Sequence, residues 1–193
     1  VATQSLRFDD GSSAYLSRTP STADNNDKLI FSFWAKRSTP SVGHKILTRY
    51  ASADNRFYIS FESNDKMYIY QKVGGSQSFN LQTNRLFRDP SAWYHIVVAY
   101  DTTQNTDSNR IKLYVNGIEE TSFSTEDYPN QNLDLYYQTA TSVVAYIGQY
   151  TSSQYFDGYI AEVNLVDGLS FFSDTSGTAN TSFNIDSFGE TKN

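Results

Sequence analysis

Hydrophobic and polar positions alternate with the period of a β-strand along much of this chain, and the clearest example lies in its middle. Residues 93–100 (WYHIVVAY) form a β-branched and aromatic run without a helix breaker. Its apolar density on both faces is typical of a strand in the centre of a two-sheet sandwich. After a polar loop over 101–109, residues 110–115 alternate apolar and polar side chains, and Asn116-Gly117 then matches a type I′ hairpin turn. The pattern predicts an all-β domain.

The first half of the chain repeats this signal in short strands separated by polar turns. We expect strands over 29–36, 45–50, 56–62 and 66–72, with a shorter one over 79–81. Successive strands joined in this way favour an antiparallel sheet. The side chains expected to form the core, from their period-two placement, are Phe31, Phe33, Phe57, Ile59, Val97, Ile111, Leu113 and Ile147.

The second half of the chain is less regular. Residues 124–140 form a long polar loop, and loops of this length are usually functional or mobile. Closing strands are expected over 143–148 and 159–166. The remaining residues are mostly Ser, Thr, Asn and Gly punctuated by phenylalanines. We therefore expect one domain over 1–169 and an extended arm over 170–193 that packs on it or leaves it, with no obligatory helix and no internal repeat.

Short stretches spread over nearly the whole chain carry a resemblance to a known family. They are WYHIVVAYD (93–101), KLYVNG (112–117), SLRF (5–8), YLSRTP (15–20), FSFWAK (31–36), YIG (146–148) and FDGYIAEV (156–163). Together they resemble laminin G-like and pentraxin-like domains of the concanavalin A-like lectin/glucanase superfamily. Together with DSFGET at 186–191, the sequences of these stretches are most similar to modules in tail-fibre and other structural proteins of marine phages and viruses. The resemblance implies a two-sheet antiparallel jelly-roll sandwich of about a dozen strands.

The same resemblance implies a function. The first reading is a non-catalytic module that binds a cell-surface glycan or glycoprotein of the host, in an extracellular setting on the virion surface. The alternative is a purely structural module that oligomerises, decorates or spaces a fibre or capsid and binds no sugar. A glycoside hydrolase is the third reading, because enzymes share this fold. A homo-oligomer is compatible with the first two readings.

Charge and composition limit the kinds of partner that we expect for this chain. The chain carries 15 basic and 21 acidic residues, a formal net charge of −6, and no stretch clusters Lys and Arg, so we expect no nucleic-acid partner. No run approaches the length of a membrane span and nothing resembles a signal peptide, so we expect no membrane insertion. The absence of cysteine rules out disulfides. Because the chain begins at Val1, we expect it to be a fragment of a longer protein.

Candidate catalytic residues are sparse. The two histidines, His44 and His95, lack an orienting acid and a nucleophile at a suitable spacing, so we interpret both as packing residues. Glycosidases need two carboxylates roughly 5 to 9.5 Å apart. The Glu-x-Asp-x-x-Glu pattern of the glucanase branch is absent; Glu119 and Glu120 are adjacent and point to opposite faces, and Glu162 stands alone. We expect no hydrolase activity.

Calcium is a further possibility that the resemblance raises. Laminin G-like and pentraxin-like domains often hold Ca²⁺ in loops at one edge of the sandwich, and Asp54 and Asn55 match the position of a ligand there. The loops that should complete the site, 139–142 and 149–152, contain no carboxylate, so binding would be weak. The competing interpretation is an ordinary turn in which the Asp54 carboxylate accepts an Asx-type hydrogen bond from the backbone. A second candidate is formed by the acidic turns Asp9-Asp10 and Asp167-Gly168.

Sugars are bound by aromatic rings stacked on the pyranose and by amide or carboxylate groups that bond the hydroxyls. Several of the 15 tyrosines lie in the segments 124–140 and 149–157, which flank one predicted strand. We expect these segments to meet at one end of the sandwich as an aromatic shelf. The glycan-binding residues expected there are Tyr136, Tyr137, Tyr150 and Tyr155, with Asn132, Asp134, Gln149 and Gln154 supplying hydrogen bonds. The competing interpretation is that the tyrosines cap the sandwich or face a neighbouring subunit.

Overall fold

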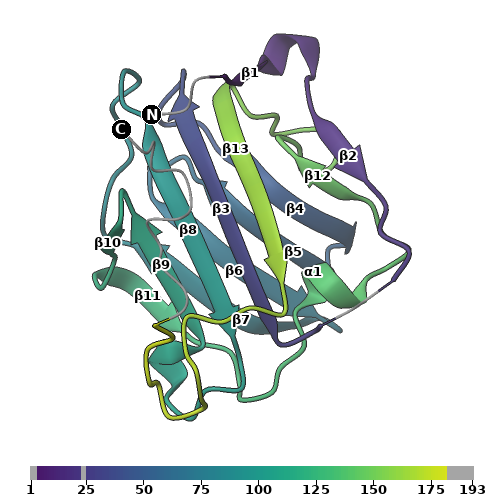
Figure 1. Ribbon diagram of the computed structural model, residues 1–193. Helices are drawn as coiled ribbons and strands as arrows, with labels where there is room; N and C mark the ends of the chain where they lie inside the picture. Colours follow the sequence, from purple (N-terminus) through teal and green to yellow (C-terminus); the bar gives the residue numbers. More distant parts are fainter. Residues whose placement is uncertain (1–3, 23–24, 182–193) are drawn as a thin grey trace.

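A computed structural model of the protein describes residues 4–22 and 25–181. Its strands form two stacked antiparallel sheets, with β3, β8 and β13 in front and β4 to β7 behind in Figure 1. The six-stranded sheet has the order β1 (Leu6–Phe8), β13 (Gly158–Asp167), β3 (Lys28–Arg37), β8 (Tyr94–Asp101), β9 (Ile111–Val115) and β10 (Ile118–Glu119). The seven-stranded sheet has the order β11 (Phe123–Asp127), β7 (Ser76–Thr83), β6 (Met67–Val73), β5 (Asn55–Phe61), β4 (His44–Ser52), β12 (Ala145–Ile147) and β2 (Leu16–Arg18). The predicted all-β, two-sheet sandwich is confirmed.

The core lies between the two sheets and is rich in phenylalanine. The predicted side chains Phe31, Phe33, Phe57, Ile59, Ile111 and Leu113 are all buried in it. Each comes from a strand whose alternate positions face the other sheet, as the period-two spacing requires. Ile147 is only partly buried and packs against the edge of this core.

Val97 is buried, as predicted, but it lies outside the main core between the sheets. Ile96 and Val98 point into the core between the sheets, whereas Val97 is buried on the outer face of the six-stranded sheet. There it packs with Ile30 and Ala99 in a second, smaller cluster. Because β8 is apolar on both faces, its sequence does not reveal which face meets the other sheet.

The long polar loop predicted over 124–140 is also partly wrong. Residues Phe123–Asp127 form the edge strand β11, which pairs with β7, and Tyr136–Thr139 form the short helix α1. An edge strand buries little of its surface, and β11 has no fully buried side chain. Its sequence therefore does not need alternating apolar and polar residues, the pattern that predicted the other strands. Two short 3-10 turns, η1 (Asp10–Ser12) and η2 (Asp107–Asn109), complete the elements.

The described part of the C-terminal segment, residues 170–181, lies against the sandwich. Ser170 Oγ donates a hydrogen bond to Asp101, and the backbone N–H of Asn105 donates to the carbonyl of Thr175. Phe171 packs edge-on against Tyr114, with 5.3 Å between ring centroids. Phe183 and Phe188, which were expected to anchor the same arm, lie outside the described residues. Within the described ranges, no helix is both long and apolar enough to span a membrane.

Candidate functional site

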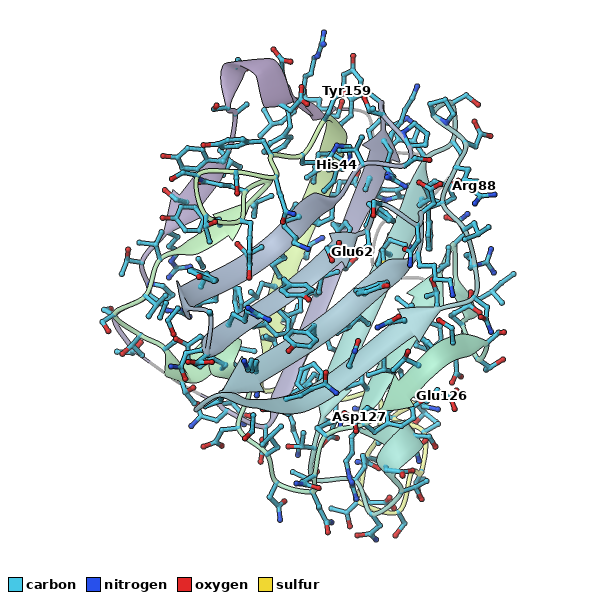
Figure 2. The ribbon with its side chains drawn as sticks, turned by 180° about the vertical axis from the view of Figure 1, so that it is seen from behind. His44, Glu62, Arg88, Glu126, Asp127 and Tyr159 are labelled. Carbon is cyan, nitrogen blue, oxygen red and sulfur yellow. The ribbon has the colours of Figure 1, made fainter. Side chains whose placement is uncertain are left out.

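The outer face of the seven-stranded sheet carries a group of tyrosine rings, which we call the tyrosine platform: Tyr50, Tyr58, Tyr70 and Tyr150. Alternation creates it, because Phe57 and Ile59 point into the core and the residue between them must point outward. Tyr58 and Tyr70 are opposite each other in the β5–β6 register, and their rings stack at 4.9 Å with an interplanar angle of 15°. Figure 2 looks onto this face, with β4 to β7 toward the viewer.

Tyr150 comes from the loop after β12 and joins the platform from its side. Its ring meets Tyr50 edge-on at 4.9 Å and Tyr58 at 6.0 Å. The rings of Tyr50, Tyr58 and Tyr150 are half-buried, so each keeps part of its surface open. Burial raises the pKa of Tyr58, with the Glu62 carboxylate adding to the effect. The phenol of Tyr58 is therefore neutral at physiological pH, and its ring acts as an apolar surface with a hydrogen-bonding tip.

Two cations are set into the platform. Lys45 is only 4% exposed, and its Nζ lies 4.3 Å from the ring centroid of Tyr58, a cation–π contact. The ammonium forms an ion pair with Glu62, which is labelled in Figure 2, and burial lowers the pKa of Lys45. The guanidinium of Arg56 lies 5.4 Å from the ring centroid of Tyr70, and its Nε is buried without a partner.

The loop that carries Tyr150 also places three other predicted site residues. Gln149 is buried; its carbonyl accepts a hydrogen bond from Thr48 Oγ1 at 2.7 Å, while its side-chain Oε1 has no partner. The Nε2 of Gln149 reaches the hydroxyl of Tyr155 at 3.4 Å, and Gln154 is exposed. The structure thus brings one half of the predicted shelf, the 149–157 half, to the edge of the platform.

The other half of the predicted shelf lies elsewhere. Tyr137 points between the sheets, with its ring centroid 4.9 Å from that of Phe31 and 5.5 Å from that of Phe57, and burial raises its pKa to about 12. Tyr136 packs against the same core. Tyr137 and Tyr150 are therefore on opposite faces of the seven-stranded sheet, and the four tyrosines do not form a single shelf.

Asn132 and Asp134 are exposed and lie in the segment that leads from β11 to α1. The backbone N–H of Asn132 donates to the carbonyl of Thr102, and the carbonyl of Asp134 accepts from Gln71 Nε2 at 3.2 Å. Gln71 faces the core, opposite to the platform residue Tyr70. Neither Asn132 nor Asp134 is therefore placed to bond a ligand that lies on the platform.

Sequence reasoning missed the strand residues of the platform, although their signal was visible. The sequence pattern of the predicted strands over 45–50, 56–62 and 66–72 was used to assign only their inward-facing side chains. Their outward positions carry Tyr50, Tyr58 and Tyr70 with Lys45 and Arg56. A run of tyrosines on the wet face of adjacent strands is an unusual surface for a sandwich, and it could have indicated this site.

The predicted calcium ligands are already engaged with other groups. Asp54 Oδ1 forms an ion pair with Lys72 Nζ at 3.0 Å, and Asn55 Oδ1 accepts a hydrogen bond from the N–H of Gly74 at 2.9 Å. A Ca²⁺ ion needs six to eight oxygens, several of them charged. These two residues fit that requirement poorly, and calcium binding stays a prediction.

The second acidic candidate is arranged differently from the expectation. Asp9 and Asp10 have carboxylate oxygens within 4.8 Å of Asp157, not of Asp167, and they form the one such group among the described residues. Asp167 is at the other end of β13, where it pairs with Leu29. Asp157 Oδ2 accepts a hydrogen bond from Thr39 Oγ1 at 2.5 Å.

The carboxylates considered for hydrolysis are held in separate ion pairs or alone. Glu119 pairs with Lys112 at 2.8 Å, and Glu120 pairs with Arg85 at 2.6 Å. Glu162 is exposed on β13. None of these three residues lies on the tyrosine platform. The carboxylate beside the platform is that of Glu62, which forms an ion pair with Lys45.

Both histidines pack against aromatic rings. His95 stacks on Trp34 with 4.9 Å between centroids, and its Nε2 lies 3.1 Å from Ser32 Oγ. His44 meets Phe156 edge-on, and burial, followed by the nearby Arg37, lowers the pKa of His44 to about 4.

Several solved structures share this fold. A putative carbohydrate binding protein from Bacteroides ovatus matches with a TM-score of 0.56 and 13% identity, over 93% of this chain and 45% of that one. Domains LG4-5 of the mouse laminin alpha1 chain match with a TM-score of 0.55 and 15% identity, over 92% and 45%. The CBM40 of the Ruminococcus gnavus IT-sialidase matches with a TM-score of 0.55 and 10% identity, over 86% and 92%. The chain thus spans less than half of the first two proteins.

At these identities the solved structures establish the fold alone. A search of curated protein sequences gave no match. A family model gives the stronger result, because the laminin G form of the concanavalin A-like lectin/glucanases superfamily matches residues 10–169. That range covers most of both sheets, from η1 to the end of β13. The chain therefore belongs to the concanavalin A-like lectin/glucanases superfamily, as the resemblance of its short stretches predicted.

Proposed function

We propose that this protein is a non-catalytic carbohydrate-binding module and that glycan binds on the tyrosine platform. The observation that supports this most is the platform itself: half-buried tyrosine rings gathered on one sheet face with two cations set among them. Buried aromatic rings with a few fixed polar groups are what a sugar-binding surface needs. Solved structures of the same fold include a CBM40 bound to alpha2,6 sialyllactose, with a TM-score of 0.54.

Each part of the platform has a role in this proposal. The exposed parts of the Tyr58 and Tyr150 rings give apolar contact to a sugar ring. Because Tyr70 and Lys45 already lie against the faces of the Tyr58 ring, Tyr58 makes this contact through its exposed edge. Arg56 Nε and Gln149 Oε1, both buried without a partner, are a donor and an acceptor for sugar hydroxyls. The Lys45–Glu62 pair holds two of the rings in place through the cation–π contacts of Lys45. No residue of the platform is assigned a step in bond cleavage.

The wider setting is part of the same proposal. We place the module in a phage or viral structural protein of the tail-fibre type, on the virion surface, with a host cell-surface glycan or glycoprotein as partner. The quoted stretches that resemble such modules support this setting. Single sugar sites are usually weak, so adhesion would need several copies held together, as a homo-oligomer or along a fibre. The fold occurs in oligomers, since the heptameric SAP-like pentraxin from Limulus polyphemus matches with a TM-score of 0.50.

The test is a glycan-array measurement followed by titration with the best glycan. Tyr58→Ala and Tyr150→Ala should each weaken binding about five- to tenfold, because one aromatic ring contact contributes about 1 to 1.4 kcal/mol. The matched control is Tyr159→Ala, a half-buried tyrosine of β13 on the other sheet, whose ring faces Trp93. The array should be run with and without calcium, which tests Asp54 and Asn55 at the same time.

Two results would contradict the proposal. If no glycan binds, or if Tyr159→Ala weakens binding as much as the platform variants, the platform is not a sugar site. If Tyr58→Ala or Tyr150→Ala instead dissociates an oligomer, the platform is a subunit interface. That result would favour the alternative of a purely structural module that binds no sugar. Release of reducing ends from a β-glucan by the parent protein would overturn the non-catalytic assignment.

A further inference from the structure

A groove runs along one open side of the sandwich, away from the tyrosine platform. It lies where the edge strand β2 and its neighbour β12 in one sheet face the edge strand β1 and its neighbour β13 in the other. Three adjoining cavities of 450, 260 and 270 Å³ make it up. The first and second share Leu16 and Val163, and the second and third share Tyr137 and Leu165, so the groove is continuous.

One end of this groove is aliphatic. Its walls include Leu6, Leu16, Val163 and Leu165, which are 56%, 46%, 40% and 45% exposed. These side chains come from both sheets and point into the same space. The bulge of β13 between Ala161 and Asn164 shifts its register, and Leu165 then pairs with the core residue Phe31 on the inward face. A contiguous patch of exposed aliphatic side chains often marks a binding site, whereas single scattered ones do not.

The other end of the groove carries a buried cation. Arg49 lines the 270 Å³ cavity, is 1% exposed, and points inward beside Phe57 in the β4–β5 register. Its Nε donates to the carbonyl of Val143 at 3.0 Å, and its Nη1 donates to the carbonyl of Tyr137. Its Nη2 is buried without a partner, and no ion pair joins Arg49 to a carboxylate among the described residues.

The charges that line this cavity are net positive. Arg18, which is exposed, lines the same cavity and adds a second positive charge. One carboxylate, Asp167, lines the cavity with them; its Oδ1 accepts a hydrogen bond from Gln138 Nε2 at 2.7 Å, and it forms no ion pair with Arg49. A buried guanidinium without an ion-pair partner is costly, and its planar fork matches the geometry of a carboxylate or a phosphate. Burial also lowers the pKa of Arg49, which an anionic partner would reverse.

We propose that this groove binds an amphiphile with a carboxylate head and an aliphatic chain, of the fatty-acid class. The carboxylate accepts from Nη2 of Arg49 and from Arg18, while the chain lies along Leu16, Val163 and Leu165. The head satisfies the unpartnered donor, and the chain covers aliphatic surface that is otherwise in water. The site is separate from the tyrosine platform, because Arg49 and Tyr58 are on opposite faces of the seven-stranded sheet.

Calorimetric titration with sodium decanoate, below its micelle concentration, tests this proposal. Decanoate should bind at least tenfold more tightly than decanol, which has the same chain without the charge. Affinity should rise about fourfold per methylene from octanoate to decanoate, the value expected for burial of a chain in an apolar groove. Decanoate should also raise the melting temperature, because it binds the folded state alone.

Two variants locate the site. Leu165→Asp places a negative charge in the groove at a half-exposed position and should abolish decanoate binding. Its matched control, Ile118→Asp, changes an equally aliphatic residue that is 68% exposed on β10 and should leave binding unchanged. Arg49→Lys keeps the charge, removes the fork and should weaken binding about tenfold; if this variant does not fold, Leu165→Asp decides the question.

The proposal is overturned if decanoate does not bind, if decanol binds as tightly, or if Leu165→Asp and Ile118→Asp bind decanoate equally well. Tyr58→Ala should leave decanoate binding intact, which separates this site from the proposed glycan site. A loss of decanoate binding in Tyr58→Ala, with an unchanged melting temperature, would assign the amphiphile to the platform and overturn the groove.

Discussion

At the scale of single residues, this fold treats its buried polar groups in two opposite ways. Arg37 and Asp65 are both buried and paired at 3.0 Å, and Asp65 also accepts from Arg88 and from the N–H of Ser41, so the Nε of Arg37 is the nitrogen of this pair that has no partner. Burial alone would raise the pKa of Asp65, but these donors outweigh it and lower the pKa. His44 is the opposite case, because both of its ring nitrogens are buried without a partner.

His44 should make the fold sensitive to acid. Its pKa in the folded state is about 4, below the 6.5 of an ordinary histidine, because burial and then Arg37 disfavour the charged ring. The unfolded chain therefore binds a proton more readily than the folded chain. Stability is fully present above about pH 6.5 and falls as pH drops toward 4, by about 3 kcal/mol in total for this one group.

The measurement is urea unfolding at intervals from pH 7.5 to pH 4, for the parent and for His44→Leu. The variant should lose less stability over this range, since leucine keeps an apolar contact with Phe156 and has no charge to gain. His95→Leu is the control; burial also lowers the pKa of His95, but the Ser32 hydroxyl bonds its ring. If His95→Leu flattens the profile and His44→Leu does not, the assignment to His44 is wrong.

At the scale of elements, the motif FDGYIAEV has a physical explanation at its glycine. Gly158 begins β13 opposite Arg37 of β3, with a φ of +148°. A Cβ there would overlap the carbonyl oxygen of Lys36 and lie 3.1 Å from the ring of Phe156. The neighbouring strands β13 and β3 can approach each other at this point only because residue 158 has no side chain.

Gly158→Ala should therefore lower stability by at least about 3 kcal/mol, because the backbone of β3 must move. Gly74→Ala is the matched control: its φ is +59°, but an added Cβ would meet nothing within 4 Å. That substitution carries backbone strain only and should cost about 1 kcal/mol. Thermal melting of both variants checks the pair. Equal shifts in melting temperature would mean that backbone strain, not the approach of β3, determines the role of Gly158.

The same scale shows what sequence could predict. Strands such as β9 alternate strictly, so their inward side chains were predictable from the period alone. In β8 both faces are apolar, and the choice of Val98 over Val97 for the main core depends on the other sheet. The polar edge strand β11 and the short helix α1 have no local signal of comparable strength. The segments 124–140 and 149–157 were expected to meet, but the seven-stranded sheet separates Tyr137 from Tyr150.

At the scale of the whole molecule, the two sheets present different outer faces. The seven-stranded sheet carries the tyrosine platform, and the six-stranded sheet carries the small apolar cluster of Ile30, Val97 and Ala99. An apolar cluster on an outer face needs a cover. Phe171 packs against it together with Tyr114 and Val166. Residues 170–181, which follow the end of the family match, therefore help to cover this cluster, and we expect them to stabilise the sandwich.

Comparing chains that end at residue 181 and at residue 169 tests this conclusion. The shorter chain loses Phe171 and the hydrogen bonds of Ser170 to Asp101 and of Gln104 to the carbonyl of Asp174. It should be less stable by roughly 2 to 4 kcal/mol, from uncovered apolar surface and an under-bonded buried carboxylate. Urea unfolding measures the difference. Equal stability would show that residues 170–181 are a dispensable arm; a destabilised but folded 1–169 chain would make them part of the domain, which contains more than the family match.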